Sequence, residues 1–226
     1  MNIVIQCAAR KRSDAGHMRR RDGKPVKLVA NPALAPSASD TIYAHPDDQA
    51  ENGRTWRDLL LDYNQSPENN PLGLRRAFDL YENPIYERLV AKFGIDNVFI
   101  LSAGWGLIPA SFLTPDYNIT FNTRADKVHH RHKKDHYEDL HLLPPDSDAR
   151  VIFLGGKDYV PLFLKLTSEA HGHRIVFYYK SPKKSSDNPP DAPGCKTQHY
   201  ITMKSTNWQY ECAHALIEGT CIPVTI

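Results

Sequence analysis

The chain lacks long apolar runs, has few cysteines and carries almost no net charge. None of its apolar runs approaches the about 20 residues that a membrane-spanning helix needs, which excludes an integral helical membrane protein. Cys7, Cys195, Cys212 and Cys221 are scattered without a C-x-x-C pair, which disfavours a disulfide framework and a zinc site. Residues 1–5 are strand-like and do not resemble a signal peptide, so we expect a reduced, cytoplasmic protein.

Signatures of nucleotide hydrolysis and of metal binding are also missing. Gly-Gly-Lys at 155–157 resembles a phosphate-cradling turn, but the G-x-x-x-x-G-K-[ST] spacing is absent. His132 and His136 would share one face of a helix, yet no H-E-x-x-H motif is present, and Lys133 and Lys134 would repel a cation. We therefore expect no metal and no cofactor, and leave an anion site at 155–157 open.

The net charge of +2 hides an uneven distribution of basic residues. Lysine and arginine concentrate in three segments, 10–27, 124–136 and 180–184. Three such segments on a nearly neutral chain suggest one positive face that binds the phosphates of a nucleic acid. Three separate solvated loops are the alternative.

Short β-branched runs alternate with helical patterns along the chain. We expect four strands and six helices, namely strands at 3–5, 98–101, 151–154 and 174–179, and helices at 55–61, 70–81, 83–94, 124–141, 157–170 and 208–217. This alternation predicts an α/β fold with a central, mainly parallel four-stranded sheet and helices on both faces. We expect a single domain over residues 1–226, with a basic, irregular insertion at about 10–53.

The unusual residues of the chain follow the expected strands. Ligands of such folds bind at the carboxyl ends of the strands. The segments that follow the four strands, 6–11, 102–106, 155–159 and 180–184, each carry glycine, a basic residue or an aromatic residue. The sequence therefore predicts that these four loops line one binding crevice.

Two of the strongest candidate segments follow the second strand. Ser-Ala-Gly-Trp-Gly at 102–106 allows close backbone approach to a ligand and offers Trp105 for stacking on a nucleobase. A turn whose Trp105 packs in the core is the alternative. Asp-Tyr-Asn at 116–118 offers a carboxylate, a stacking ring and an amide that can read the edge of a base. An Asx turn followed by a strand explains the same residues equally well.

Cys7 invites comparison with a catalytic nucleophile, because Arg10 and Lys11 would lower the pKa of its thiol. No G-x-S-x-G elbow and no nearby histidine accompany it. We expect Cys7 to be a small buried residue at the end of the first strand.

Several motifs together resemble those of YaaA-like domains. Residues 5–11 resemble their strand-Cys-x-x-x-Lys opening, and residues 80–86 are similar to their Leu-Tyr-x-x-Pro-x-Phe helix start. Residues 101–117 resemble their Leu-Ser-Ala-x-x-Gly-Leu segment with its later Pro and Tyr, and residues 154–159 their Leu-x-Gly-x-x-Tyr. The segment beginning at Ser102 also resembles a domain of archaeosine synthases and their transglycosylase relatives.

The resemblance covers residues 3–8 and 76–180. It implies a uracil-DNA-glycosylase-like fold and a nucleic-acid-binding domain that breaks N-glycosidic bonds. The Gly-Gln-Asp-Pro-Tyr loop of true uracil-DNA glycosylases is absent, so no water-activating residue carries over from them. Glycosylases of this kind occur in bacterial defence against phages with modified bases, which makes antiviral defence one role that the resemblance implies.

Our leading hypothesis is a DNA glycosylase that hydrolyses the N-glycosidic bond of a flipped, modified base and leaves an abasic site, without a cofactor. A carboxylate would stabilise the oxocarbenium-like transition state and orient water. Asp116 is the first choice for that carboxylate, Asp158 the second, and Asn118 completes the catalytic set. The partner is DNA, either a duplex with a flipped base or a single strand, with no membrane; the oligomeric state stays open.

The remaining site residues fall into two groups. The base-binding group comprises Gln6, Cys7, Ser102, Gly104, Trp105 and Tyr117. The phosphate-binding group comprises Arg10, Lys11, Lys157, Arg131, Lys133, Lys134 and Lys183. Two alternatives remain open: a non-catalytic DNA-binding stress protein of the YaaA type, and a base-exchanging transglycosylase or nucleoside-processing enzyme.

Overall fold

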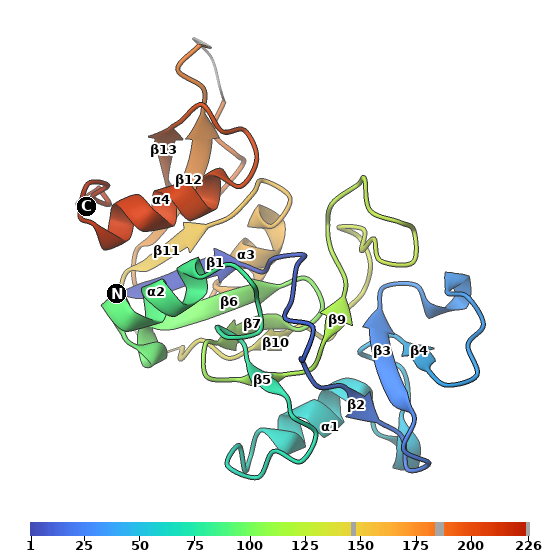
Figure 1. Ribbon diagram of the computed structural model, residues 1–226. Helices are drawn as coiled ribbons and strands as arrows, with labels where there is room; N and C mark the ends of the chain where they lie inside the picture. The colour runs from blue at the N-terminus through green and yellow to red at the C-terminus, as the bar shows by residue number, and fades with distance from the viewer. Residues whose placement is uncertain (146–147, 184–187, 225–226) are drawn as a thin grey trace.

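A seven-stranded sheet lies at the centre of the molecule (Figure 1). The computed structural model describes residues 1–145, 148–183 and 188–224. The strands of the sheet are β1 (Asn2–Gln6), β6 (Val98–Ser102), β7 (Gly106–Pro109), β10 (Leu140–His141), β11 (Val151–Leu154), β12 (Arg174–Lys180) and β13 (Lys196–Ile201). Their order across the sheet is β10-β7-β6-β1-β11-β12-β13, and every neighbouring pair is parallel except the β6–β7 hairpin.

The four predicted strands are the four central strands of this sheet. β6, β1, β11 and β12 lie side by side, and their apolar runs are buried on both faces, as expected for parallel strands covered by helices. The prediction of a mainly parallel α/β sheet is confirmed, but the sheet has seven strands instead of four. Two of the additional strands were not predicted because β10 has only two residues and β13 is a mostly polar edge strand.

From the neighbouring strands β1 and β11, the chain crosses over to strands on opposite sides of the sheet. α2 (Ile85–Phe93) lies between β1 and β6, whereas α3 (Val160–Leu166) connects β11 to β12. Because such crossovers are right-handed, α2 and α3 cover opposite faces of the sheet. In Figure 1, α2 and α4 (Trp208–Ile217) lie in front of the sheet and α3 lies behind it. The neighbouring strands β1 and β11 therefore form the topological switch point, where ligands of such sheets bind.

Helix prediction succeeded where the sequence contains clear helix boundaries. α1 (Trp56–Tyr63) begins with a capping box between Thr55 and Asp58, and α2 ends at Gly94, which has a positive φ of 87°. Three short 3₁₀ helices, Pro32–Leu34, Glu51–Gly53 and Ile95–Asn97, complete the helices of the described residues.

Two predicted helices are wrong. The segment 70–81 forms turns and the strand β5 (Arg75–Arg76), because the Asn70 side chain bonds the backbone of Leu74 and β5 pairs with β8 (Leu113–Thr114). The segment 124–141 forms turns and ends in β10, with the Asp126 carboxylate accepting from the Val128 backbone N–H. In both segments, side chains that bond the backbone locally compete with helix formation.

The segment 10–53, expected to be irregular, carries a second small sheet. Its strands are β2 (Met18–Arg19), β3 (Pro25–Val29) and β4 (Ile42–Ala44), and β9 (Tyr117–Asn118) pairs with β3. This small sheet lies beside the central sheet on the right of Figure 1, and its Val26 and Leu28 belong to the same buried cluster as the central strands. No helix among the described residues has the length and hydropathy to cross a bilayer.

Candidate functional site

A cavity of about 440 Å³ opens at the switch point between β1 and β11. It is bounded by the segment after β1, the turn after β11, the segment after β9 and the start of α4, which approach one another in Figure 1. Its lining includes Gln6, Cys7, Lys11, Asn118, Phe121, Arg124, Gly156, Asp158, Tyr159, Asn207, Trp208 and Tyr210. The volume lies within the range of small-molecule sites and is large enough for a nucleobase.

The walls of this cavity combine aromatic rings with amide groups. Phe121 and Tyr159 meet edge to face, with ring centroids 5.0 Å apart, and Trp208 and Tyr210 come from the first turn of α4. The Gln6 Oε1 accepts the Gly156 backbone N–H, which fixes the amide and leaves its NH₂ group as a donor for a ligand. Such a lining suits a flat, polar-edged molecule.

Hydroxyl groups and one thiol form a buried network beneath the cavity. The Cys7 Sγ lies 3.3 Å from the Tyr159 hydroxyl, and the Tyr81 and Tyr117 hydroxyls lie 2.9 Å apart. Burial raises the pKa of Tyr81, Tyr117 and Tyr159 well above the ordinary value, so these phenols stay protonated. The expected placement of Cys7 as a small buried residue at the end of β1 is confirmed, since 5% of it is exposed.

Lys11 brings an amine to the cavity wall. Its Nζ lies 4.2 Å from the centroid of the Tyr117 ring, and its backbone pairs with that of Tyr81. Burial lowers the pKa of Lys11 below its ordinary value, against the opposing influence of Cys7 and Asp116. The lysine is half-buried, and its predicted role as a phosphate ligand stays a prediction.

Asp158 places a carboxylate at the rim of the cavity. It follows β11 in the Gly-Gly-Lys-Asp turn, and its Oδ1 lies 2.8 Å from the Lys133 Nζ. The ion pair links the turn after β11 to the 124–136 segment. The Lys133 amine is therefore paired with a carboxylate, although half of its side chain remains exposed to solvent.

Hollows on either side extend the cavity along the edge of the sheet. One is lined by Arg10 and Glu82 and shares Asn207 and Tyr210 with the cavity. Another, of about 490 Å³, is lined by Lys157 and shares Asp158 and Trp208 with the cavity. Arg10 and Lys157 thus flank the cavity on opposite sides, an arrangement that suits a chain of phosphates running past it.

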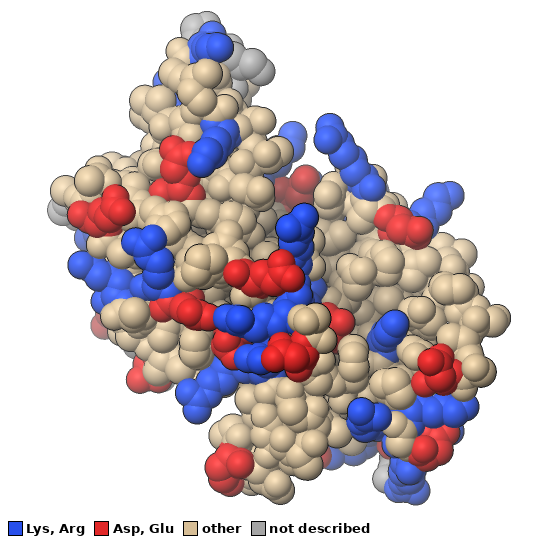
Figure 2. Space-filling view, in the orientation of Figure 1, with Lys and Arg blue, Asp and Glu red and all other residues tan. Residues whose placement is uncertain are grey.

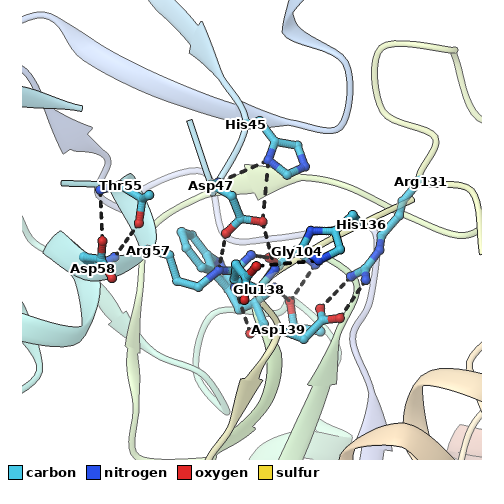
Figure 3. Close-up of polar contacts among 12 residues, drawn as sticks. His45, Asp47, Thr55, Arg57, Asp58, Gly104, Arg131, His136, Glu138 and Asp139 are labelled. Carbon is cyan, nitrogen blue, oxygen red and sulfur yellow. Dashed lines mark hydrogen bonds and ion pairs between the residues drawn. The ribbon is translucent and has the colours of Figure 1, made fainter. Parts of the chain in front are cut away.

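The Ser-Ala-Gly-Trp-Gly loop, in contrast, is sealed inside the protein. Trp105 and Ser102 are fully buried, and Arg57 donates to the carbonyl oxygens of Gly104 and Trp105 at 3.1 and 3.0 Å. Arg57 in turn pairs with Asp47 (Figure 3). A Cβ on Gly104 would lie 3.1 Å from the Tyr117 ring, so the backbone is packed against protein and not against a ligand.

A second buried arginine holds the same loop from the other side. Arg131 donates to the Ala103 carbonyl at 2.7 Å and forms a bidentate pair with Asp139, as Figure 3 shows for the two charged side chains. Its guanidinium lies 3.6 Å from the Tyr137 ring centroid. Arg131 is 4% exposed and its Nη1 and Nη2 donors are engaged within the protein, so it is a structural residue and not a phosphate ligand. Its Nε is buried and has no hydrogen-bond partner among the described residues.

Four predicted base-binding residues therefore belong to the core. Ser102, Gly104, Trp105 and Tyr117 are buried, and the Ser102 hydroxyl donates to the Tyr117 hydroxyl at 2.8 Å. Ser102 Oγ also accepts from the backbone N–H groups of Gly104 and Trp105. This internal bonding leaves no ring face or polar group of the loop open to a base. Gln6 and Cys7 are the predicted base-binding residues that do line the cavity.

The two predicted catalytic carboxylates lie in different hollows. Asp158 lines the main cavity, whereas Asp116 lines a smaller one of about 210 Å³ together with Lys27, Tyr43 and His129. Asn118 is exposed and borders both. Asp158, the second choice, is therefore the carboxylate at the main cavity, and the catalytic role of either residue stays a prediction.

The basic segments do not form one continuous positive surface on the face drawn in Figure 2. On the face drawn in Figure 2, lysine and arginine are interspersed with aspartate and glutamate. Arg12, Arg20 and Arg21 of the first segment pair with carboxylates of Asp79, Glu87 and Glu51. Lys134 and Lys183 are exposed, whereas Lys184 of the third segment lies outside the described residues.

Sequence reasoning missed part of the cavity lining. Phe121, Trp208 and Tyr210 come from segments that no motif marked, whereas Arg124 belongs to the basic segment 124–136. The topology of the sheet predicts that a cavity lies at the ends of β1 and β11. It does not predict that α4 and the segment after β9 pack beside this cavity, because that depends on tertiary contacts. Within the described residues, no three histidine, cysteine or acidic side chains gather in a metal-binding arrangement.

Comparisons with protein-family models, with curated proteins and with solved structures returned no match to this chain.

Proposed function

We propose that this protein is a DNA glycosylase that hydrolyses the N-glycosidic bond of a flipped, modified base and leaves an abasic site. The observation that carries the proposal is the composition of the switch-point cavity, which combines aromatic rings, amides and one carboxylate in about 440 Å³. Rings and amides are the groups that recognise a flipped base, and a carboxylate is the group that stabilises the cation formed when its glycosidic bond breaks.

Recognition of the base is assigned to the cavity walls. Tyr210 is half-buried and supplies the most accessible ring, whereas Phe121 and Trp208 line the cavity with 5% of each residue exposed. Stacking on such rings contributes about 1–3 kcal/mol per base. Gln6 and Asn118 supply amides for the Watson–Crick edge of the base. The volume beyond these groups accommodates a substituent on the base.

The DNA backbone would follow the groove that passes the cavity. Arg10 and Lys157 lie in the flanking hollows, and Arg124 lies at the cavity itself. Three cations spaced along one groove would contact the phosphates that flank a flipped nucleotide. This placement uses residues from three different segments and does not need a uniformly positive face.

Asp158 takes the catalytic role in this proposal. Its carboxylate, oriented by Lys133, would stabilise the oxocarbenium-like transition state and orient the attacking water. Asp116 would act only indirectly, through its charge near Lys11. Such a reaction removes the base with water as the nucleophile.

The test is to incubate the protein with phage DNA that carries modified cytosines, and with unmodified DNA, and to measure abasic sites. Asp158→Asn keeps the size of the side chain and should lower base release by about 10²–10⁴-fold. Asp116→Asn is the matched control, since it removes the same charge from the neighbouring hollow, and should retain most of the activity.

Each other outcome selects a different function. DNA binding without base release from any substrate would contradict catalysis and favour a DNA-binding protein of the YaaA type. Turnover of free nucleosides with little affinity for long DNA would favour a nucleoside-processing enzyme. Equal activity of Asp158→Asn and wild type would remove Asp158 from the mechanism.

A further inference from the structure

We infer that Lys11 forms an imine with the C1′ aldehyde of an abasic deoxyribose, so that this protein captures an abasic site covalently. The inference deepens the proposed function, on which it rests for the presence of deoxyribose in the cavity. It adds an amine nucleophile to a site whose base-releasing step needs only Asp158 and water.

The position of Lys11 is the first support. Lys11 lines the same cavity as Asp158 and lies on the segment that leaves β1 at the switch point. Its backbone pairs with that of Tyr81, and the next residue, Arg12, donates its backbone N–H to the Leu80 carbonyl at 2.9 Å. The amine is therefore carried by a fixed segment at the wall of the cavity.

The surroundings of the amine are the second support. Its Nζ faces the Tyr117 ring at 4.2 Å, and among the described residues no carboxylate oxygen lies within ion-pair distance of it. Lys133, whose partner Asp158 lines the cavity, is by contrast paired with that carboxylate at 2.8 Å. A partly buried lysine without a carboxylate partner holds its proton less firmly, and the lowered pKa of Lys11 follows from the same burial.

Desolvated lysines beside carbonyl carbons act as Schiff-base nucleophiles, because only the neutral amine has a free electron pair. The nitrogen of Lys11 would attack C1′ of the ring-opened sugar, which forms a C1′–N bond. The aldehyde oxygen then leaves as water with the two hydrogens of the amine, which gives the C=N bond. The step needs no oxidant or reductant, and water reverses it.

The test supplies the abasic site directly and so bypasses base release. The full chain is mixed with an oligonucleotide that carries one preformed abasic deoxyribose, in the presence of sodium borohydride. Borohydride delivers hydride to C1′ of the imine and turns it into a stable secondary amine. We expect a protein–DNA adduct on a denaturing gel, with the added mass mapped to Lys11 by peptide mass spectrometry.

Two variants of Lys11 and two controls sharpen the result. Lys11→Arg keeps the positive charge but cannot form the imine, and should lower the trapped fraction by about tenfold or more, as should Lys11→Met. Lys92→Arg makes the same substitution at an exposed lysine of α2 and should trap as wild type does. Lys24→Arg, at a second exposed lysine that does not line the cavity, should also trap as wild type does.

An absent adduct with wild type, or an adduct that maps to another residue, overturns the inference. Mapping on the wild-type protein keeps this decision independent of whether the Lys11 variants fold. The two proposals fail separately: base release from modified DNA without trapping leaves the glycosylase standing, whereas trapping without base release leaves an abasic-site binder.

Discussion

The Ser-Ala-Gly-Trp-Gly loop after β6 and the cavity between β1 and β11 lie at the same end of the parallel strands, yet they differ in what they expose. The loop is enclosed by Arg57 and Arg131, which satisfy the carbonyls of three consecutive residues. The cavity is open, and its lining comes from four separate segments. The most unusual stretch of sequence therefore maintains the scaffold, and less conspicuous residues line the cavity.

The difference has a physical origin in the chain connection. β6 continues into a tight hairpin with β7, so its end turns back against the sheet and is covered by β10 and by the 124–139 segment. Gly106 has φ of 94°, and a Cβ there would lie 2.4 Å from the Leu140 carbonyl oxygen, so glycine is required for the hairpin to pack. β1 and β11 instead lead to helices on opposite faces, which opens a crevice between them.

Removal of the arginine that closes the loop should break the scaffold. Arg131→Met leaves the Asp139 carboxylate, which is fully buried, without its bidentate partner and the Ala103 carbonyl without its donor. We expect the free energy of unfolding to fall by about 3 kcal/mol, measured by urea denaturation, because the buried carboxylate loses its bidentate partner and keeps the Lys165 amine, at 3.4 Å, as a weaker counter-charge.

Lys134→Met is the matched control for that change. It removes one positive charge from an exposed position of the same segment, so its effect should stay within about 0.5 kcal/mol. If both variants unfold at the same urea concentration as wild type, the buried ion pair does not stabilise the loop as described.

Two further substitutions should distinguish the structural role of the loop from the binding role proposed for the cavity. Ser102→Ala removes a hydroxyl that bonds the Tyr117 hydroxyl and two backbone N–H groups, and should destabilise the protein by about 1–3 kcal/mol. Asn118→Ala removes an exposed amide at the cavity mouth, and should leave stability within about 0.5 kcal/mol while weakening base release.

Thermal unfolding and base release, measured on both variants, check this contrast. We expect a lower melting temperature with retained specific activity for Ser102→Ala, and an unchanged melting temperature with lower specific activity for Asn118→Ala. A specific activity lost in the folded fraction of Ser102→Ala would mean that the loop takes part in the chemistry after all.

Much of the fold could be predicted because its signals are local. Apolar runs mark the central strands β1, β6, β11 and β12, and the Thr55 cap and Gly94 mark helix boundaries. The failures over 70–81 and 124–141 have one cause. There, local bonds from side chains such as Asn70 hold turns, and a single sequence does not reveal which side chains will make them.

The candidate site could be predicted only in part, because burial is a tertiary property. The sequence places Gln6, Cys7, Lys11 and Asp158 at strand ends, and these residues do line the cavity. It cannot tell that Trp105 turns into the core, since the enclosing arginines lie more than 25 residues away on both sides along the chain. An aromatic residue in a glycine-rich loop fits a stacking platform and a core anchor equally well.

The smallest expected effect concerns how the groove meets DNA. Arg124 and Lys134 are exposed on the segment that borders the cavity, and Arg124 lines it. Arg124→Glu with Lys134→Glu should weaken DNA binding by about tenfold and reduce the slope of log affinity against log salt by about 2, because two phosphate contacts no longer release counterions. Lys24→Glu with Lys92→Glu changes the net charge equally at two exposed lysines that do not line the cavity. Fluorescence anisotropy across a salt series measures both pairs. Phosphate contacts in the groove are local, whereas net charge affects the whole molecule. The Arg124→Glu, Lys134→Glu variant should therefore reduce the salt dependence of binding, and the Lys24→Glu, Lys92→Glu variant should not. Equal losses of DNA affinity in the two double variants would show that DNA does not bind along this groove, and would contradict a role of the cavity in DNA binding.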